Sequence, residues 1–246
     1  MARLLTSDDL RPGDILLFAN RSRWSLKVLC LRVFCRSYYT HAAIYLGDSV
    51  VAEATLCNGV AKARISIPRR GHVAVIRTQA GSCCGLGFDD EMTNALHRYV
   101  DKVIAAGAGY NLAVAALCNA FGAHSRRRQK HFEDVIQLLN RPIEESDKEL
   151  RWLSRLWYPK TQAYWCSEFV GNCYFNVGIL HGSMTGAQPP KLLLPADIVN
   201  AVDFGWVAGF LAHAGNHIPD DDICLQGTKH WEVCATSPAR CPRCPY

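Results

Sequence analysis

The stretch Tyr164–Val170, which reads Tyr-Trp-Cys-Ser-Glu-Phe-Val, places a cysteine at the start of an apolar segment. Beyond Cys166 the apolar residues recur at intervals of three and four, and Gly178 follows as a stop signal; they are Phe169, Val170, Cys173, Tyr174 and Val177. This pattern predicts a buried helix with Cys166 in its first turn. The free backbone N–H groups and the dipole at that end favour a thiolate, the nucleophilic form of cysteine. Because most cysteines are only small buried hydrophobes, a nucleophile also requires a base elsewhere in the chain.

Composition indicates one globular domain with an appended tail. The chain has 246 residues, of which 49% are hydrophobic and 20% charged, which is enough for a sizeable core. We expect a catalytic domain over 1–215 and a cysteine- and proline-rich tail over 216–246. The formal net charge of +5 is a mild excess, compatible with an acidic partner or an anionic membrane surface but also common among ordinary soluble proteins.

The cysteines and the first residues of the sequence bear on location. The 12 cysteines are scattered through apolar segments, and no apolar run of signal-peptide length precedes the acidic pair Asp8–Asp9. We therefore expect reduced thiols and a cytoplasmic protein.

The first third of the chain is typical of a small antiparallel sheet or partial barrel. A turn at Arg11–Asp14 precedes the apolar run Ile15–Phe18, and further strand-like runs follow. They cover 40–46, 50–55, 60–67 and 72–77.

The turn Gly47–Ser49 joins two of these runs in a hairpin whose register decides what it presents. A three-residue loop pairs Leu46 with Val50 and Ala43 with Glu53, so that His41 and Glu53 share a face as diagonal neighbours. A two-residue loop instead turns Glu53 away from His41. With the first register, we expect the Cys166 helix to pack against the face that carries His41 and Glu53.

Helical patterns dominate the rest of the chain, so the predicted fold class is α+β. Acidic residues at Asp89–Glu91 open a helix with an apolar stripe to Ile104, and a second helix is expected after Asn111. Ser146–Glu149 forms a capping box for a helix through Trp157, and a short helix is expected from Pro195.

Two basic segments and the tail carry further hypotheses. Segment 21–36 mixes arginines with apolar side chains around the whole helix, so a half-buried helix is favoured over a peripheral membrane contact. The run 124–131 contains no aromatic residue for base stacking, which favours a solvated loop and no nucleic-acid binding. Cys241 and Cys244 form one C-x-x-C pair, not the two half-sites of a zinc ribbon, so we expect no metal.

Four segments together carry a resemblance to a known family. They are Gly13–Leu16, Thr40–Gly47 with His41, Val51–Ala54 with Glu53, and Tyr164–Val170 with Cys166. They resemble the circularly permuted NlpC-like hydrolases of papain-like fold, in particular the YiiX/YebB-type branch, in which histidine, acid and cysteine follow in the reverse of papain's order. Gly109–Asn111 and Pro195–Asp197 are similar to further family landmarks. The resemblance covers about residues 9 to 205 and leaves segment 21–36 and the tail unmatched.

The resemblance implies a thiol-dependent hydrolase with a catalytic triad of Cys166, His41 and Glu53. Relatives act on amide, ester or thioester bonds in peptides or lipids, so the implied substrate is a peptide or a lipid acyl group. This chemistry needs no cofactor and no metal. We expect Tyr164, Trp165 and Glu168 beside the nucleophile as candidate substrate-binding residues, with a structural role favoured for Glu168. A catalytically silent binding module of the same fold and a lipid acyltransferase stay open as alternatives.

Overall fold

The computed structural model describes residues 2–20, 39–78, 87–111, 163–180, 193, 195–200 and 204–226. Several predicted features lie outside these residues, namely segment 21–36, the helix after Asn111, the basic run 124–131, the capped helix at 146–157 and the tail cysteines Cys234, Cys241 and Cys244.

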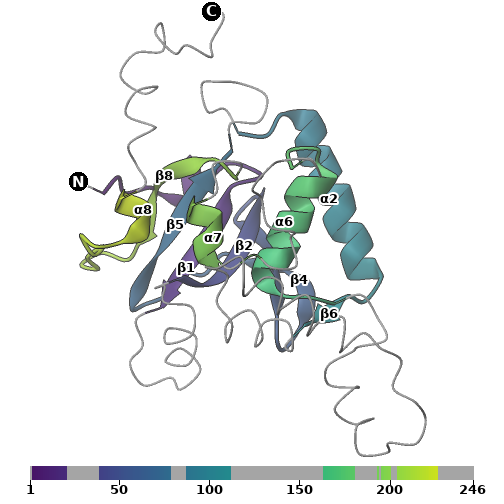
Figure 1. The fold of residues 1–246 in the computed structure, drawn as a ribbon, viewed down its shortest axis with the longest axis horizontal. Helices are drawn as coiled ribbons and strands as arrows, with labels where there is room; N and C mark the ends of the chain where they lie inside the picture. Colours follow the sequence, from purple (N-terminus) through teal and green to yellow (C-terminus); the bar gives the residue numbers. More distant parts are fainter. Residues whose placement is uncertain are drawn as a thin grey trace, which may run out of the picture.

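The fold is built on an antiparallel sheet of six strands in the order β4-β3-β2-β1-β5-β8 (Figure 1). The strands are β1 (Ile15–Asn20), β2 (Tyr39–Gly47), β3 (Val50–Thr55), β4 (Gly59–Arg64), β5 (Gly71–Arg77) and β8 (Trp206–Ala212). Two short strands, β6 (Gly109–Tyr110) and β7 (Ala163–Tyr164), form a separate parallel pair. The helices are the 3-10 turn η1 (Ser7–Asp9), α2 (Asp90–Ala105), α6 (Cys166–Asn176), α7 (Pro195–Asn200) and α8 (Ile223–Gln226). The predicted α+β class with an antiparallel sheet is confirmed.

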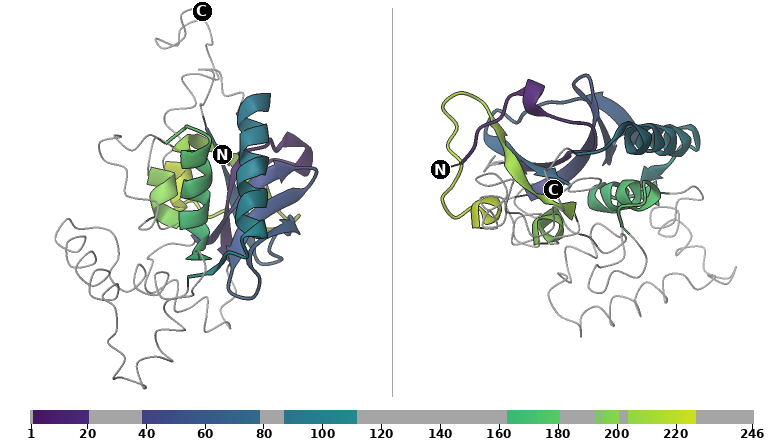
Figure 2. Two further views of the ribbon diagram at one scale, coloured as in Figure 1. Left: turned by 90° about the vertical axis from the view of Figure 1, so that its right-hand side faces the viewer. Right: turned by 90° about the horizontal axis from the view of Figure 1, so that it is seen from above.

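The sheet separates two apolar cores. Helices α2 and α6 lie side by side on one face, where α6 contacts β2 and β3 (Figures 1 and 2). The larger core fills that side and includes Ala42, Ile44 and Phe169. Seen from above in Figure 2, the sheet is strongly curved, and a second core around Leu16 and Ala43 lies on its other face. The helix that begins at Cys166 is therefore fixed against the centre of the sheet.

Helix α2 follows the predicted pattern closely. The Asp89 side chain accepts a hydrogen bond from the Met92 N–H, at 2.8 Å, and so caps the first turn. The helix buries Leu96, Val100 and Val103, which belong to the predicted stripe. Local sequence thus determines both where this helix begins and which side faces the core.

The hairpin between β2 and β3 has the predicted register but a different turn. Ala43 pairs with Glu53 as predicted, yet Gly47 and not Leu46 pairs with Val50. Asp48 and Ser49 have φ of 50° and 59°, which is the geometry of a two-residue type I′ turn. The register shifts between Tyr45 and Gly47, so a bulge at Leu46 adds the residue that the turn lacks. The predicted three-residue loop is wrong, and the bulge restores the register that it implied.

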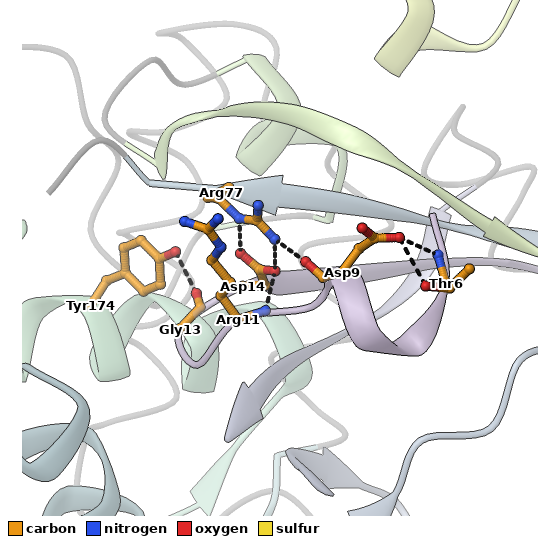
Figure 3. A network of polar contacts seen from close by, with 7 residues as sticks. All are labelled: Thr6, Asp9, Arg11, Gly13, Asp14, Arg77 and Tyr174. Atoms are coloured by element: carbon orange, nitrogen blue, oxygen red, sulfur yellow. Dashed lines mark hydrogen bonds and ion pairs between the residues drawn. The ribbon is translucent and has the colours of Figure 1, made fainter. Parts of the chain in front are cut away.

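A buried ion pair fastens the turn before β1 (Figure 3). Arg77 on β5 binds both carboxylate oxygens of Asp14, from Nε at 2.8 Å and from Nη2 at 2.6 Å. The same carboxylate accepts the backbone N–H of Arg11, and Tyr174 on α6 donates to the carbonyl of Gly13. Gly13 has a φ of +88°, and a Cβ there would lie 2.4 Å from the ring of Phe88. The turn, the sheet and helix α6 are thereby joined at one point.

Strand β8, which extends the sheet beyond β5, was not expected from the sequence. The segment after it reaches back to the sheet through Asp222, which is fully buried. The Asp222 carboxylate accepts a hydrogen bond from Tyr39 Oη at 2.8 Å and lies 2.8 Å from His72 Nε2. It also accepts the backbone N–H of Cys224, at 2.9 Å. Residues 216–226, assigned to the tail by sequence, therefore pack on the domain.

Among the described helices, none is both long enough and apolar enough to span a bilayer.

Candidate active site

Helix α6 begins at Cys166, as predicted, and the side chain of Cys166 is almost completely buried. Trp165 is the extended N-cap residue, and its backbone N–H donates to Glu168 Oε2 at 3.3 Å. Cys166 is 4% exposed, and Phe169, Val170 and Cys173 behind it are fully buried. The thiol thus lies in the first turn, where backbone N–H groups have no intrahelical acceptor.

His41 and Glu53 meet on adjacent strands, as the register requires. His41 Nε2 on β2 lies 2.7 Å from Glu53 Oε2 on β3. The side chains are 26% and 22% exposed, so this pair opens to solvent while Cys166 does not. Since Nε2 is used by Glu53, Nδ1 is the ring nitrogen left for another partner.

The His41 side chain and the backbone of Ala42 both lie close enough to the Cys166 thiol to lower its pKa. Ser167 Oγ lies 3.9 Å from the sulfur. Cys166, His41 and Glu53, which are far apart in the sequence, therefore lie close together in the structure. His41 lies between the other two.

The predicted packing of the helix on the face of His41 and Glu53 is wrong. Ala42 and Ile44 belong to the core beneath α6, whereas Ala43 belongs to the opposite core. His41 pairs with Phe18, which packs against that opposite core too. The pairing of β2 with β3 ends at Ala43 and Glu53, and beyond this end the thiol lies close to the Ala42 backbone and to the His41 imidazole.

The contacts shift both titrations in the direction of an ion pair. Burial raises the pKa of Cys166, but the hydrogen bond and charge of His41, with the Ala42 N–H, outweigh it and hold the pKa below its ordinary value. Burial lowers the pKa of His41, but Cys166 and Glu53, as hydrogen-bond acceptors and negative charges beside the ring, outweigh it and raise the pKa to about 10. Both shifts therefore favour a thiolate beside an imidazolium over a neutral thiol beside a neutral imidazole.

Cys173 shows what burial does without such partners. It lies two turns further along α6, is fully buried, and burial raises its pKa well above the ordinary value. The reactive form of Cys166 thus comes from its partners and not from its helix alone.

The candidate substrate-binding residues are almost closed to solvent. Tyr164, Trp165 and Glu168 are 5%, 2% and 4% exposed. Tyr164 Oη lies 3.3 Å from Tyr99 Oη, and Glu168 accepts from the start of its own helix. Within the described part of the chain, the buried Nε1 of Trp165 has no hydrogen-bond partner. The contacts of Tyr164 and Glu168 are structural, and a contact of any of the three with substrate stays a prediction.

Sequence reasoning missed Phe18 as a neighbour of the site. Its ring centroid lies 5.5 Å from that of His41, with the planes inclined by 44°. The run Ile15–Phe18 predicted the strand, but no signal in the sequence indicated which residue of β2 would stand opposite Phe18.

No protein-family model matches the chain. A stretch of 51 residues, 21% of this chain, is 45% identical to the probable lipoprotein peptidase YaeF of Escherichia coli (strain K12). The stretch covers 18% of that protein, so the chain matches less than a fifth of its length. A part of the chain is thus similar to a part of a probable peptidase.

Proposed function

We propose that this protein is a cysteine hydrolase that cleaves an amide, ester or thioester bond in a peptide or lipid substrate. The observation that carries the proposal is the position of His41, which contacts the Cys166 thiol and the Glu53 carboxylate at once. A nucleophile, a base and an orienting carboxylate in that order are the components of thiol-dependent acyl transfer to water.

The reaction follows from these contacts. The Cys166 thiolate attacks the carbonyl carbon and forms a thioester as the leaving group departs. The imidazolium of His41 gives its proton to that leaving group, and the neutral ring then removes a proton from the water that hydrolyses the thioester. Glu53 keeps the ring oriented and stabilises its charged form, while the backbone N–H of Cys166, at the start of the helix, binds the oxyanion in this proposal.

The same arrangement supports a permuted papain-like core of the NlpC-like, YiiX/YebB type. The chain order is histidine on β2, acid on β3 and cysteine on α6, with the helix against an antiparallel sheet. The partial similarity to a probable peptidase makes a peptide amide the first bond to test. Cytoplasmic location and a peripheral lipid contact through segment 21–36 stay predictions.

The test combines labelling with turnover. Purified protein is incubated with electrophilic acyl probes and with peptide and lipid acyl libraries, and the modified residue is identified by mass spectrometry. We expect a thioester on Cys166 and turnover that is lost in Cys166→Ala and His41→Ala but retained in Cys173→Ala, the matched variant on the same helix. Labelling confined to the exposed Cys57, or substrate binding without any turnover, would favour the silent binding module instead.

A further inference from the structure

Three side chains stand in a row across the centre of the sheet. Glu53 on β3 is diagonal to His41 on β2, and His41 pairs directly with Phe18 on β1. Because paired and alternate residues of a sheet share a face, all three project from the same side. The imidazole therefore has a carboxylate on one flank and an aromatic ring on the other.

Phe18 is held more firmly by its neighbours than His41 is. Phe18 is half-buried and packs against the core that contains Leu16, Ala43 and Val73. Its strand is paired on both sides, with β2 and with β5. His41 has a strand partner only on the Phe18 side, because the pairing of β2 with β3 ends at Ala43, and 26% of its side chain is exposed. The His41 imidazole therefore packs against the ring of Phe18, whose backbone is fixed on both sides by strand pairing.

We propose that Phe18 is a positioning residue that holds the His41 imidazole between Glu53 and Cys166 and favours its charged form. The inference rests on the proposed function, since it assigns Phe18 a part in keeping the thiolate and the imidazolium together.

The physical basis is steric and electrostatic. A centroid separation of 5.5 Å and an inclination of 44° are within the range of a favourable aromatic contact. The ring restricts rotation of the imidazole about its side-chain bonds, so that Nε2 stays on Glu53 and the imidazole stays beside the Cys166 thiol. The negative face of an aromatic ring also attracts a nearby cation within about 6 Å of its centroid. Both effects stabilise the ion pair relative to the neutral thiol and imidazole.

The test measures the rate at which iodoacetamide alkylates Cys166 as a function of pH, residue by residue, in the full chain. In the wild type we expect a rise in rate centred below the ordinary thiol pKa. Phe18→Met and Phe18→Leu should move that midpoint to higher pH by roughly half a unit, the size of an exposed cation–π contact. Phe18→Trp, which keeps an aromatic face, should retain the wild-type midpoint. Met is close to Phe in size, so at least this variant is expected to fold.

Leu211→Ala is the matched control. Leu211 is buried in the same core as Phe18 but lies on β8, separated from β1 by β5. The Leu211→Ala variant should have a lower melting temperature and an unchanged midpoint of the pH profile of Cys166 alkylation. If Phe18→Met lowers only the melting temperature, or if Phe18→Trp shifts the midpoint as far as Phe18→Met, the positioning role is wrong while the hydrolase proposal stands. If wild-type Cys166 shows no reactivity below the ordinary thiol range, the proposed function fails and this inference fails with it.

Discussion

His41 Nε2 and Glu53 Oε2 lie 2.7 Å apart although the turn that connects their strands is one residue shorter than their register requires. The bulge at Leu46 supplies the missing residue. Without it, Glu53 would point to the opposite face of the sheet. A single local irregularity therefore decides whether the imidazole has a carboxylate partner.

Neutralising that carboxylate should weaken turnover without abolishing it. Glu53→Gln removes a charge that helps to raise the pKa of His41 to about 10, after the larger contribution of the Cys166 hydrogen bond. We expect the alkaline limb of the kcat/KM profile to move to lower pH, because the imidazolium then loses its proton more easily. The loss in kcat should be about 10²- to 10⁴-fold and smaller than for Cys166→Ala. Equal losses in the two variants would show that Glu53 does more than orient the ring.

Thiol labelling should distinguish Cys166 from Cys173 at neutral pH. The first has a lowered pKa and the second a pKa raised by burial alone, although both lie on α6. We expect mass-spectrometric alkylation rates at pH 6 to 7 to be higher for Cys166, with the exposed Cys57 as a measure of access. His41→Ala should bring the rate of Cys166 down toward that of Cys173. Equal rates in the wild type would mean that the thiolate is not formed.

The Asp222 contacts should contribute a pH-dependent part of the stability. Burial raises the pKa of Asp222, but hydrogen bonds from His72 and Tyr39 outweigh it and hold the pKa below 3.8. The stabilisation is therefore present above pH 3.8 and is lost as the pH falls through the lower, folded-state value. Asp222→Asn should lower the free energy of unfolding by about 3 kcal/mol at pH 7, and this difference should narrow below about pH 4. Denaturant titrations at both pH values measure it, and a difference independent of pH would contradict the assignment.

The stability that Arg77 contributes should depend on the shape of its guanidinium group as well as on its charge. It binds both oxygens of Asp14 and also the carbonyl of Asp9, which a lysine ammonium cannot reproduce. We expect Arg77→Lys to lower the free energy of unfolding by about 1–2 kcal/mol. Lys62→Ala, which removes an exposed ion pair with Asp101, should cost less than about 1 kcal/mol. A similar loss in the free energy of unfolding for the two variants would show that the two-oxygen contact of Arg77 with Asp14 adds no more stability than an exposed ion pair.

Truncation should locate the true edge of the domain. The tail expected from the sequence, 216–246, includes Cys224, but Cys224 is buried and its backbone N–H bonds to Asp222. We now expect a chain ending at Gln226 to keep its melting temperature and a chain ending at Pro219 to lose about 10 °C, since it lacks Asp222. Stoichiometric zinc in the full chain, lost together with stability on cutting after Gln226, would instead favour a metal-bound tail.

Sequence alone predicted the elements whose signals are local. The acidic start of α2 at Asp89–Glu91, the stripe of α2 and the start of α6 at Cys166 depend on residues within a few positions of one another. The pairing of Ala43 with Glu53 was also predicted, although for the wrong turn, because both the three-residue loop and the bulged two-residue turn produce the same alternation.

Features that depend on distant residues were missed. Asp222 meets Tyr39 across 183 positions, and no pattern in either neighbourhood signals the other. The apolar run of β8 was available, but its place beside β5 depends on which sheet edge is free. The side of the sheet that α6 covers was predicted wrongly because alternation states which residues share a face, not where a pairing ends and a side chain can be reached from the other side.

The pairing of β8 with β5 also sets the time at which the protein can finish folding on the ribosome. Strands β1 to β5 are synthesised early, but the edge of β5 has no partner until β8, which begins at Trp206, has been synthesised. At roughly 5 to 20 residues per second, that edge is without β8 for on the order of ten seconds. An unpaired strand edge is a template for association with other chains. Conditions that slow synthesis between β5 and β8 should therefore favour aggregation of the nascent chain.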